Sequence, residues 1–116
     1  MERRYRLSRS RDFDAVYRRG WSVSTRFLTL HWFPRESDEE GVPRLGLAVP
    51  KGVGTAVTRN RIKRQLRAAW QELADTVPAG RDYVLAARPG IVEPAQARGH
   101  DWIVHEVAVV LGKAAA

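Results

Sequence analysis

The chain has 116 residues and a mass of 13.1 kDa, which suits one modest hydrophobic core and predicts a single domain over residues 1–116. It has no cysteine, which excludes a disulfide framework, a thiol nucleophile and a Cys-containing zinc site. The formal net charge is +7, the pI is near 10.8, and no apolar run approaches the roughly 20 residues of a membrane-spanning helix. We therefore expect a cytoplasmic protein whose partner is a polyanion, nucleic acid rather than a membrane.

The N-terminal third predicts a helix followed by strands. A first helix is expected over Arg11–Arg19, because Phe13 and Tyr17 share a face and Gly20 is a common C-terminal signal. Residues 21–33 are rich in β-branched and aromatic types and alternate in places, which indicates strand. The alternation places two sets of side chains on opposite faces: Leu28, Leu30 and Trp32 on one, and Phe27, Thr29, His31 and Phe33 on the other.

The middle of the chain begins with an acidic connection. Residues 36–43 carry four acids and no base, and their turn-forming composition predicts a solvent-facing hairpin loop. Arg44–Val49 is expected to be a short strand that ends at Pro50. Gly52 and Gly54 then form the turn into the next helix, whose N-terminus could make a local phosphate contact. The full sequence patterns of nucleotide-binding loops are absent.

The remaining elements complete an α+β arrangement. A long basic helix is predicted over about Ala56–Asp75, a strand over Asp82–Ala87, and a Pro/Gly-punctuated connection over 89–100. A last helix is expected over Asp101–Lys113, with one apolar stripe. The predicted order is α-β-β-β-α-β-α, a single-domain sandwich in which helices pack on a small mixed sheet. The apolar stripe of the last helix comprises Ile103, Val107, Val110 and Leu111.

The basic helix is the most informative element. The stretch from Arg44 to Gln71 carries seven cations and no acid, so its formal charge equals that of the whole chain. At helical spacing the apolar residues Ile62, Leu66, Ala69 and Leu73 line one stripe, with Trp70 at its margin. The cations lie on the opposite side of the helix from this stripe. An ordinary solvated helix mixes charges of both signs, whereas like charges one turn apart repel by a few tenths of a kcal/mol per pair. An outer face of one sign therefore favours an anionic partner.

The sequence shows no pattern typical of a catalytic or metal-binding site. His31, His100 and His105 have no metal-ligand spacing, and no serine lies in a nucleophile elbow. Acids near the basic stretches are few, which disfavours a two-metal nuclease centre. We therefore predict no catalytic residue, no metal ligand and no cofactor bound by the protein itself.

Two segments together carry a family resemblance. Residues 44–67, RLGLAVPKGVGTAVTRNRIKRQLR, resemble the signature of the bacterial ribonuclease P protein component, with Arg59, Asn60 and Arg61 as its core. Residues 6–20, RLSRSRDFDAVYRRG, resemble the first helix of that family. The resemblance covers about residues 4–88. It departs from the family at Pro50, where a serine usually precedes the lysine, and at Ala68 and Ala69, where the family often has an acid.

The resemblance implies a fold, a function and two sets of site residues. The crossover through the basic helix would be left-handed, against the general rule. The protein would be the RNA-binding subunit of ribonuclease P, which removes the 5′ leader of precursor tRNA, while the RNA subunit carries the catalytic centre and its Mg²⁺ ions. Binding to the RNA subunit is assigned to Lys51, Arg59, Asn60, Arg61, Lys63, Arg64 and Arg67. Binding to the single-stranded leader is assigned to Arg9, Arg11, Phe13, Tyr17 and His31, the last at a position where the family often has an aromatic residue.

The residues themselves are compatible with this division. Single-stranded RNA is bound by aromatic side chains in basic grooves, and structured RNA by arrays of cations on phosphates. Arg outnumbers Lys by 17 to 3, which suits bidentate phosphate contacts. For Phe13 the alternative is ordinary packing of the first helix. For the whole chain the alternatives are a small ribosomal or ribosome-assembly protein and an independent metal nuclease. The aromatic helix followed by the Arg-Asn-Arg helix favours the ribonuclease P subunit.

Overall fold

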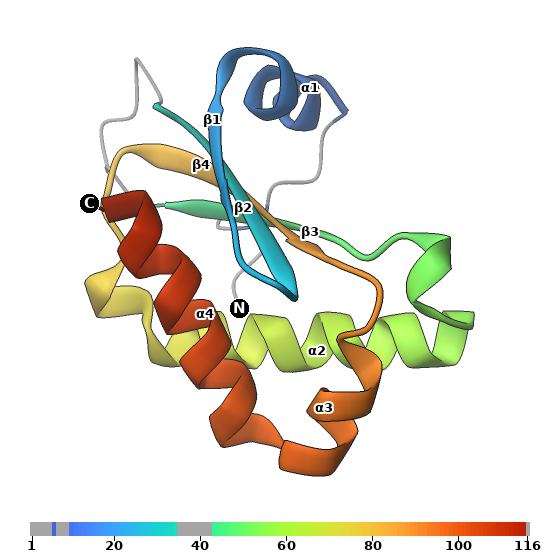
Figure 1. Cartoon of the computed structure of the whole chain (residues 1–116). Coiled ribbons are helices and arrows are strands. Elements are labelled where there is room, and N and C mark those ends of the chain that lie inside the picture. Colours follow the sequence, from blue (N-terminus) through green and yellow to red (C-terminus); the bar gives the residue numbers. More distant parts are fainter. Residues whose placement is uncertain (1–5, 7–9, 35–42, 116) are drawn as a thin grey trace.

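The fold is α+β, as predicted, and is described by a computed structural model for residues 6, 10–34 and 43–115 (Figure 1). Its four strands form one sheet in the spatial order β1-β2-β4-β3. In chain order the elements are α1 (Ser10–Arg19), β1 (Trp21–Ser24), β2 (Leu28–Pro34), β3 (Arg44–Ala48), the 3₁₀ turn η2 (Lys51–Val53), α2 (Ala56–Glu72), the 3₁₀ turn η3 (Ala74–Thr76), β4 (Arg81–Ala87), α3 (Val92–Arg98) and α4 (His100–Ala115).

The sheet is mixed, and its pairing corrects one prediction. β1 pairs with β2 and β2 with β4 in antiparallel fashion, whereas β3 and β4 are parallel. Residues 36–43 therefore join two strands that are separated by β4, so the expected hairpin is wrong. Residues 35–42 lie outside the described part of the chain. Parallel neighbours need a crossover, and α2 provides it between β3 and β4. This is the crossover that the family resemblance predicts to be left-handed.

Helices cover both faces of the sheet. In Figure 1, α2 and α4 lie on one side and α1 on the other. The main core fills the first layer, where the buried stripe of α4 (Ile103, Val107, Val110 and Leu111) meets the sheet, as predicted. A smaller cluster lies under α1, where Val16 and Val84 are buried and Phe13 and Phe33 pack against them. The second layer is thin because a single short helix covers that face.

The alternation in β2 is confirmed, with one exception. Leu28 and Leu30 are buried in the main core and Trp32 packs against it, while Phe33 faces the cluster under α1. Phe27 precedes β2 and packs against the main core, so its predicted face is wrong. Its ring meets Trp102 of α4 edge to face at a centroid distance of 5.2 Å. The chain turns before β2 begins, and the period-2 rule holds only inside a strand.

The connection over 89–100 contains a helix that the sequence did not indicate. α3 runs from Val92 to Arg98 and buries Ala95. Pro94 is its third residue, in the first turn, where the missing N–H of proline breaks no intrahelical hydrogen bond. A helix of two turns with one buried residue has too little apolar periodicity to be recognised from sequence.

The basic helix begins and ends close to the predicted limits. Thr55 caps α2, because its hydroxyl accepts a hydrogen bond from the Thr58 backbone N–H at 3.3 Å. α2 ends at Glu72, and η3 continues the chain. The buried side chains of α2 match the expected stripe, with Leu73 partly buried just beyond it. They are Ile62, Leu66, Ala69 and Trp70.

Candidate nucleic-acid interface

The cations of α2 lie at graded depths around the helix. Arg59, Lys63 and Arg67 follow one another at one-turn spacing beside the buried stripe, and all three are partly buried. Asn60 and Arg64 are exposed at the centre of the outer face. On the opposite flank Arg61 is partly buried, and Lys51 is exposed in η2, before the helix begins. We call these seven residues the α2 basic face.

Desolvation and mutual repulsion act on this face. Burial and the nearby Arg6 guanidinium both lower the pKa of Arg67. The Arg59 Nε is buried and has no hydrogen-bond partner within the described part of the chain. A buried donor without a partner costs free energy, and an anion near this face would reduce the repulsion between its cations. The α2 basic face therefore contains groups that gain from an anionic partner.

One cation of the basic stretch is used inside the protein. Arg44 donates from Nε to Asp82 Oδ1 at 2.8 Å and from Nη2 to Oδ2 at 2.7 Å. Asp82 is only 5% exposed. The charge of Arg44 thus serves the β3–β4 pair rather than the outer surface.

A groove of about 580 Å³ lies on the face of the sheet that carries α1. Tyr17 of α1 is 46% exposed, and its ring meets that of His31 of β2 edge to face, with centroids 4.7 Å apart. Lys63 of α2 lines the same groove. We call it the Tyr17 groove; its lining residues are Tyr17, Thr29, His31, Leu47, Ala48, Val49, Pro50, Lys63, Ala86, Ala87, Arg88 and Pro89.

Burial favours the uncharged forms of the two rings of the groove. It raises the pKa of Tyr17 and lowers the pKa of His31. A neutral phenol and a neutral imidazole present aromatic faces to a ligand, while Lys63 and Arg88 supply positive charge at the same groove. Aromatic faces beside cations are the chemistry that binds unpaired nucleotides.

The predicted leader-binding residues are only partly brought together. Tyr17 and His31 meet in the groove, but Phe13 packs in the cluster under α1 and does not line it. Arg9 lies outside the described residues, and Arg11 is in α1. Lys63, which the family resemblance assigns to RNA-subunit binding, also lines the groove.

Sequence reasoning missed most of the groove wall. Thr29 could have been found, because it shares the predicted face of His31. Arg88 and Pro89 could not, because they enter the groove only where β4 ends between β2 and β3. Val49 and Pro50 line it because β3 is parallel to β4 and ends beside it.

The described part of the chain shows neither a metal site nor a membrane-spanning helix. Among those residues, no three His, Asp or Glu side chains are grouped in a way that could hold a metal ion. No helix there has both the length and the apolar character needed to cross a membrane.

The chain is similar to proteins of one family over nearly its whole length. The Ribonuclease P family model matches residues 1–114. The ribonuclease P protein component of Halalkalibacterium halodurans is 35% identical over 113 residues, covering 96% of this chain and 93% of that protein. A mutant of the Staphylococcus aureus RNase P protein superposes with a TM-score of 0.81 at 30% identity, covering 98% and 91% of the two chains.

A more distant structure supports the fold alone. The RNase P protein from Thermotoga maritima has a TM-score of 0.82 at 24% identity, covering 93% of this chain and 96% of that one. The four-stranded mixed sheet, the basic crossover helix and the near full-length matches agree with one another. The chain therefore belongs to the ribonuclease P protein family, the protein component of the RNA–protein enzyme that processes the 5′ end of tRNA.

Proposed function

We propose that the protein binds two RNA molecules with two adjoining surfaces. The Tyr17 groove holds the single-stranded 5′ leader of precursor tRNA, and the α2 basic face holds the catalytic RNA subunit. The observation that carries this proposal is the meeting of Tyr17 and His31 with Lys63 in one groove. An exposed aromatic ring beside a cation fits an unpaired nucleotide, whose base and phosphate need these two contacts.

The half-exposed ring of Tyr17 supports the leader assignment. The His31 ring contacts it edge to face, which fixes its orientation and leaves part of its surface open. A base can stack there without first ordering the side chain, so less conformational entropy is lost on binding. Lys63 is suited to an adjacent leader phosphate, which makes it the residue at which the two RNA surfaces meet.

The α2 basic face suits a folded RNA. Its cations are spread over several turns of a rigid helix and can follow phosphates at fixed spacing. Arg61 and Arg64 can make bidentate contacts to phosphates.

In this arrangement the protein assists catalysis without performing it. The RNA subunit supplies the active centre with its Mg²⁺ ions. The protein binds the leader and reduces phosphate repulsion, so that the RNA needs less Mg²⁺ to assemble. Precursor tRNA is the expected substrate, and the cytoplasm, where bacterial tRNA is transcribed, is the expected location.

Reconstitution with a catalytic ribonuclease P RNA tests the proposal. We expect the protein to raise the cleavage rate of precursor tRNA most at low Mg²⁺, and its contribution to shrink as Mg²⁺ is raised. Lys63→Ala should weaken the binding of leader-bearing tRNA more than that of mature tRNA. Cleavage by the protein without any RNA subunit would overturn the proposal, and so would RNA binding with no stimulation of cleavage at any Mg²⁺ concentration.

A further inference from the structure

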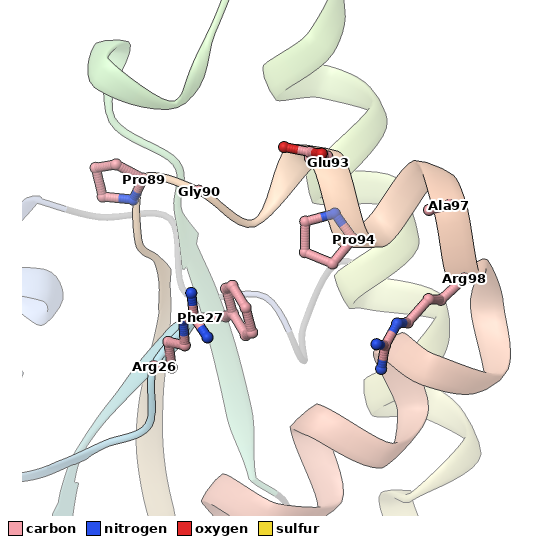
Figure 2. A pocket seen from close by; sticks show the side chains of 8 residues that line it. All are labelled: Arg26, Phe27, Pro89, Gly90, Glu93, Pro94, Ala97 and Arg98. Atoms are coloured by element: carbon pink, nitrogen blue, oxygen red, sulfur yellow. The ribbon is translucent and has the colours of Figure 1, made fainter.

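A second hollow adjoins the Tyr17 groove and shares Pro89 with it. It has a volume of about 540 Å³ and is formed by the turn before β2, the segment after β4 and one side of α3 (Figure 2). We call it the α3 pocket. The side chains that matter for its chemistry are Arg26, Phe27, Pro89, Glu93, Pro94 and Arg98.

Phe27 positions one of the two arginines of this pocket. The Arg26 guanidinium lies over the Phe27 ring, with its central carbon 5.3 Å from the ring centroid. Phe27 in turn packs edge to face on Trp102. This succession of contacts holds a planar cation on an anchored ring. Guanidinium planes of this kind stack on unpaired bases and also bind phosphate.

The second arginine extends toward the same space from α3. Figure 2 shows the Arg98 guanidinium directed into the pocket, with the Phe27 ring between it and Arg26. Glu93 lies toward the Pro89–Gly90 side of the pocket. No ion pair links Glu93 to either arginine among the described residues, although all three line one pocket. Both exposed guanidinium groups are thus available to an anion.

The α3 pocket continues the Tyr17 groove. Pro89 lines both hollows. The adjoining Arg88, which lines the groove, donates from its backbone N to Phe27 O at 2.9 Å and from Nη1 to Thr25 O at 2.8 Å. These two hydrogen bonds tie the groove wall to the segment that carries Arg26. A strand of RNA lying in the groove can therefore pass Pro89 and enter the α3 pocket without leaving the protein surface.

We propose that the α3 pocket binds a further nucleotide of the leader, next to those held in the Tyr17 groove. Arg26 supplies a stacking plane for the base, and Arg98 contacts a phosphate. Glu93 lowers the affinity by repelling that phosphate, and it therefore limits how tightly long leaders bind. This inference rests on the assignment of the groove to the leader.

The test uses the reconstituted enzyme and precursor tRNAs whose leaders are lengthened one nucleotide at a time, with mature tRNA as the leaderless reference. For leaders long enough to pass Pro89, Arg26→Ala and Arg98→Ala should each weaken binding by up to about fivefold, as expected for one exposed ion pair. Shorter leaders and mature tRNA should bind as they do to the unchanged protein. Glu93→Gln should strengthen the binding of long leaders. Asp101→Asn, which removes one exposed acid at the start of α4 outside the pocket, should not.

The outcomes separate this inference from the function on which it rests. Arg19→Ala is the matched arginine control, because Arg19 is exposed at the end of α1 and lines neither hollow. If Tyr17→Ala weakens every leader-bearing tRNA while Arg26→Ala and Arg98→Ala behave like Arg19→Ala, the α3 pocket is not a leader site and the groove still is. Equal losses on mature tRNA would assign the two arginines to another RNA contact and overturn the inference. If Tyr17→Ala shows no leader dependence, the groove assignment itself fails.

Discussion

Arg44 donates two hydrogen bonds to Asp82 directly across the parallel pair of β3 and β4, at 2.8 and 2.7 Å. The carboxylate is nearly buried, with 8% of its side chain exposed, whereas the arginine side chain keeps 30%. Removing the cation takes two hydrogen bonds from a carboxylate in a poorly hydrated place, whereas removing the acid takes them from a cation that can reach water. The two partners therefore differ in what their loss costs.

We predict that Arg44→Met lowers the free energy of unfolding by about 3 kcal/mol, and Asp82→Asn by about 1–2 kcal/mol. Methionine keeps most of the apolar stem of the arginine, so the loss reports chiefly on the ion pair. Urea unfolding of both variants at neutral pH measures the difference. A larger loss for Asp82→Asn than for Arg44→Met would show that the burial of the carboxylate does not control the energy of this pair.

Phe13 should behave as a core residue. It packs against Val16 and Val84 under α1 and does not line the Tyr17 groove. We predict that Phe13→Ala lowers the free energy of unfolding by about 2–3 kcal/mol, below the range for fully buried phenylalanine because the side chain is partly exposed. Phe13→Leu should restore most of that stability and bind leader-bearing tRNA normally. Thermal unfolding and tRNA titration together check this. A stable Phe13→Leu variant with a leader-specific binding loss would place Phe13 in the leader site.

The α2 basic face predicts a steep dependence of RNA binding on salt. Each phosphate that the protein neutralises contributes roughly 0.7–0.9 to the slope of log affinity against log salt concentration. Arg64→Ala should lower that slope by about one unit for the RNA subunit, with little effect on folding because the side chain is exposed away from the buried stripe. Lys113→Ala on α4 is the control and should leave the slope unchanged. An unchanged slope together with a lower melting temperature for Arg64→Ala would show that this residue stabilises the fold and does not bind RNA.

The sequence predicted α1, α2 and α4 because each has a strong periodic signal. The positive charge of α2 could also be predicted from the sequence, because counting charged residues does not require knowing which strands are neighbours. The wall of the Tyr17 groove depends on that knowledge. Arg88 and Val49 meet there because β3 and β4 are parallel and end at one edge, and no local pattern in either strand specifies its neighbour. Phe13 and Tyr17 lie one turn apart on α1 and are both assigned to the leader by the family resemblance, yet only Tyr17 reaches the groove.

His31 should make stability depend on pH. Burial lowers its pKa in the folded protein below the ordinary value of 6.5, so the unfolded chain binds more protons between the two pKa values. Stability should therefore fall as the pH is lowered through 6.5 and the folded pKa, and the contribution of His31 to this slope should vanish only well above 6.5. His31→Phe should reduce the pH dependence of the free energy of unfolding in this pH range, whereas His105→Gln on α4 should not. An NMR titration that gave His31 a pKa above 6.5 would contradict the effect of burial.

Tyr17 should distinguish substrates that carry a leader from those that do not. A base stacked on an aromatic ring is worth about 1–3 kcal/mol, so Tyr17→Ala should weaken the binding of precursor tRNA by roughly five- to 150-fold. Tyr17→Phe keeps the ring and should lose little. Mature tRNA should bind all three proteins alike, because it has no leader to place in the groove.

The same titrations separate binding of the leader from assembly with the RNA subunit. Arg59→Ala and Arg61→Ala lie on the α2 basic face and should impair assembly, which lowers activity on every substrate by the same factor. Tyr17→Ala leaves that face intact, so its complex with the RNA subunit should form at the normal protein concentration. Equal losses of affinity for precursor and mature tRNA with Tyr17→Ala would show that the Tyr17 groove does not bind the leader. A stacking site for the leader cannot affect the binding of a tRNA that has no leader.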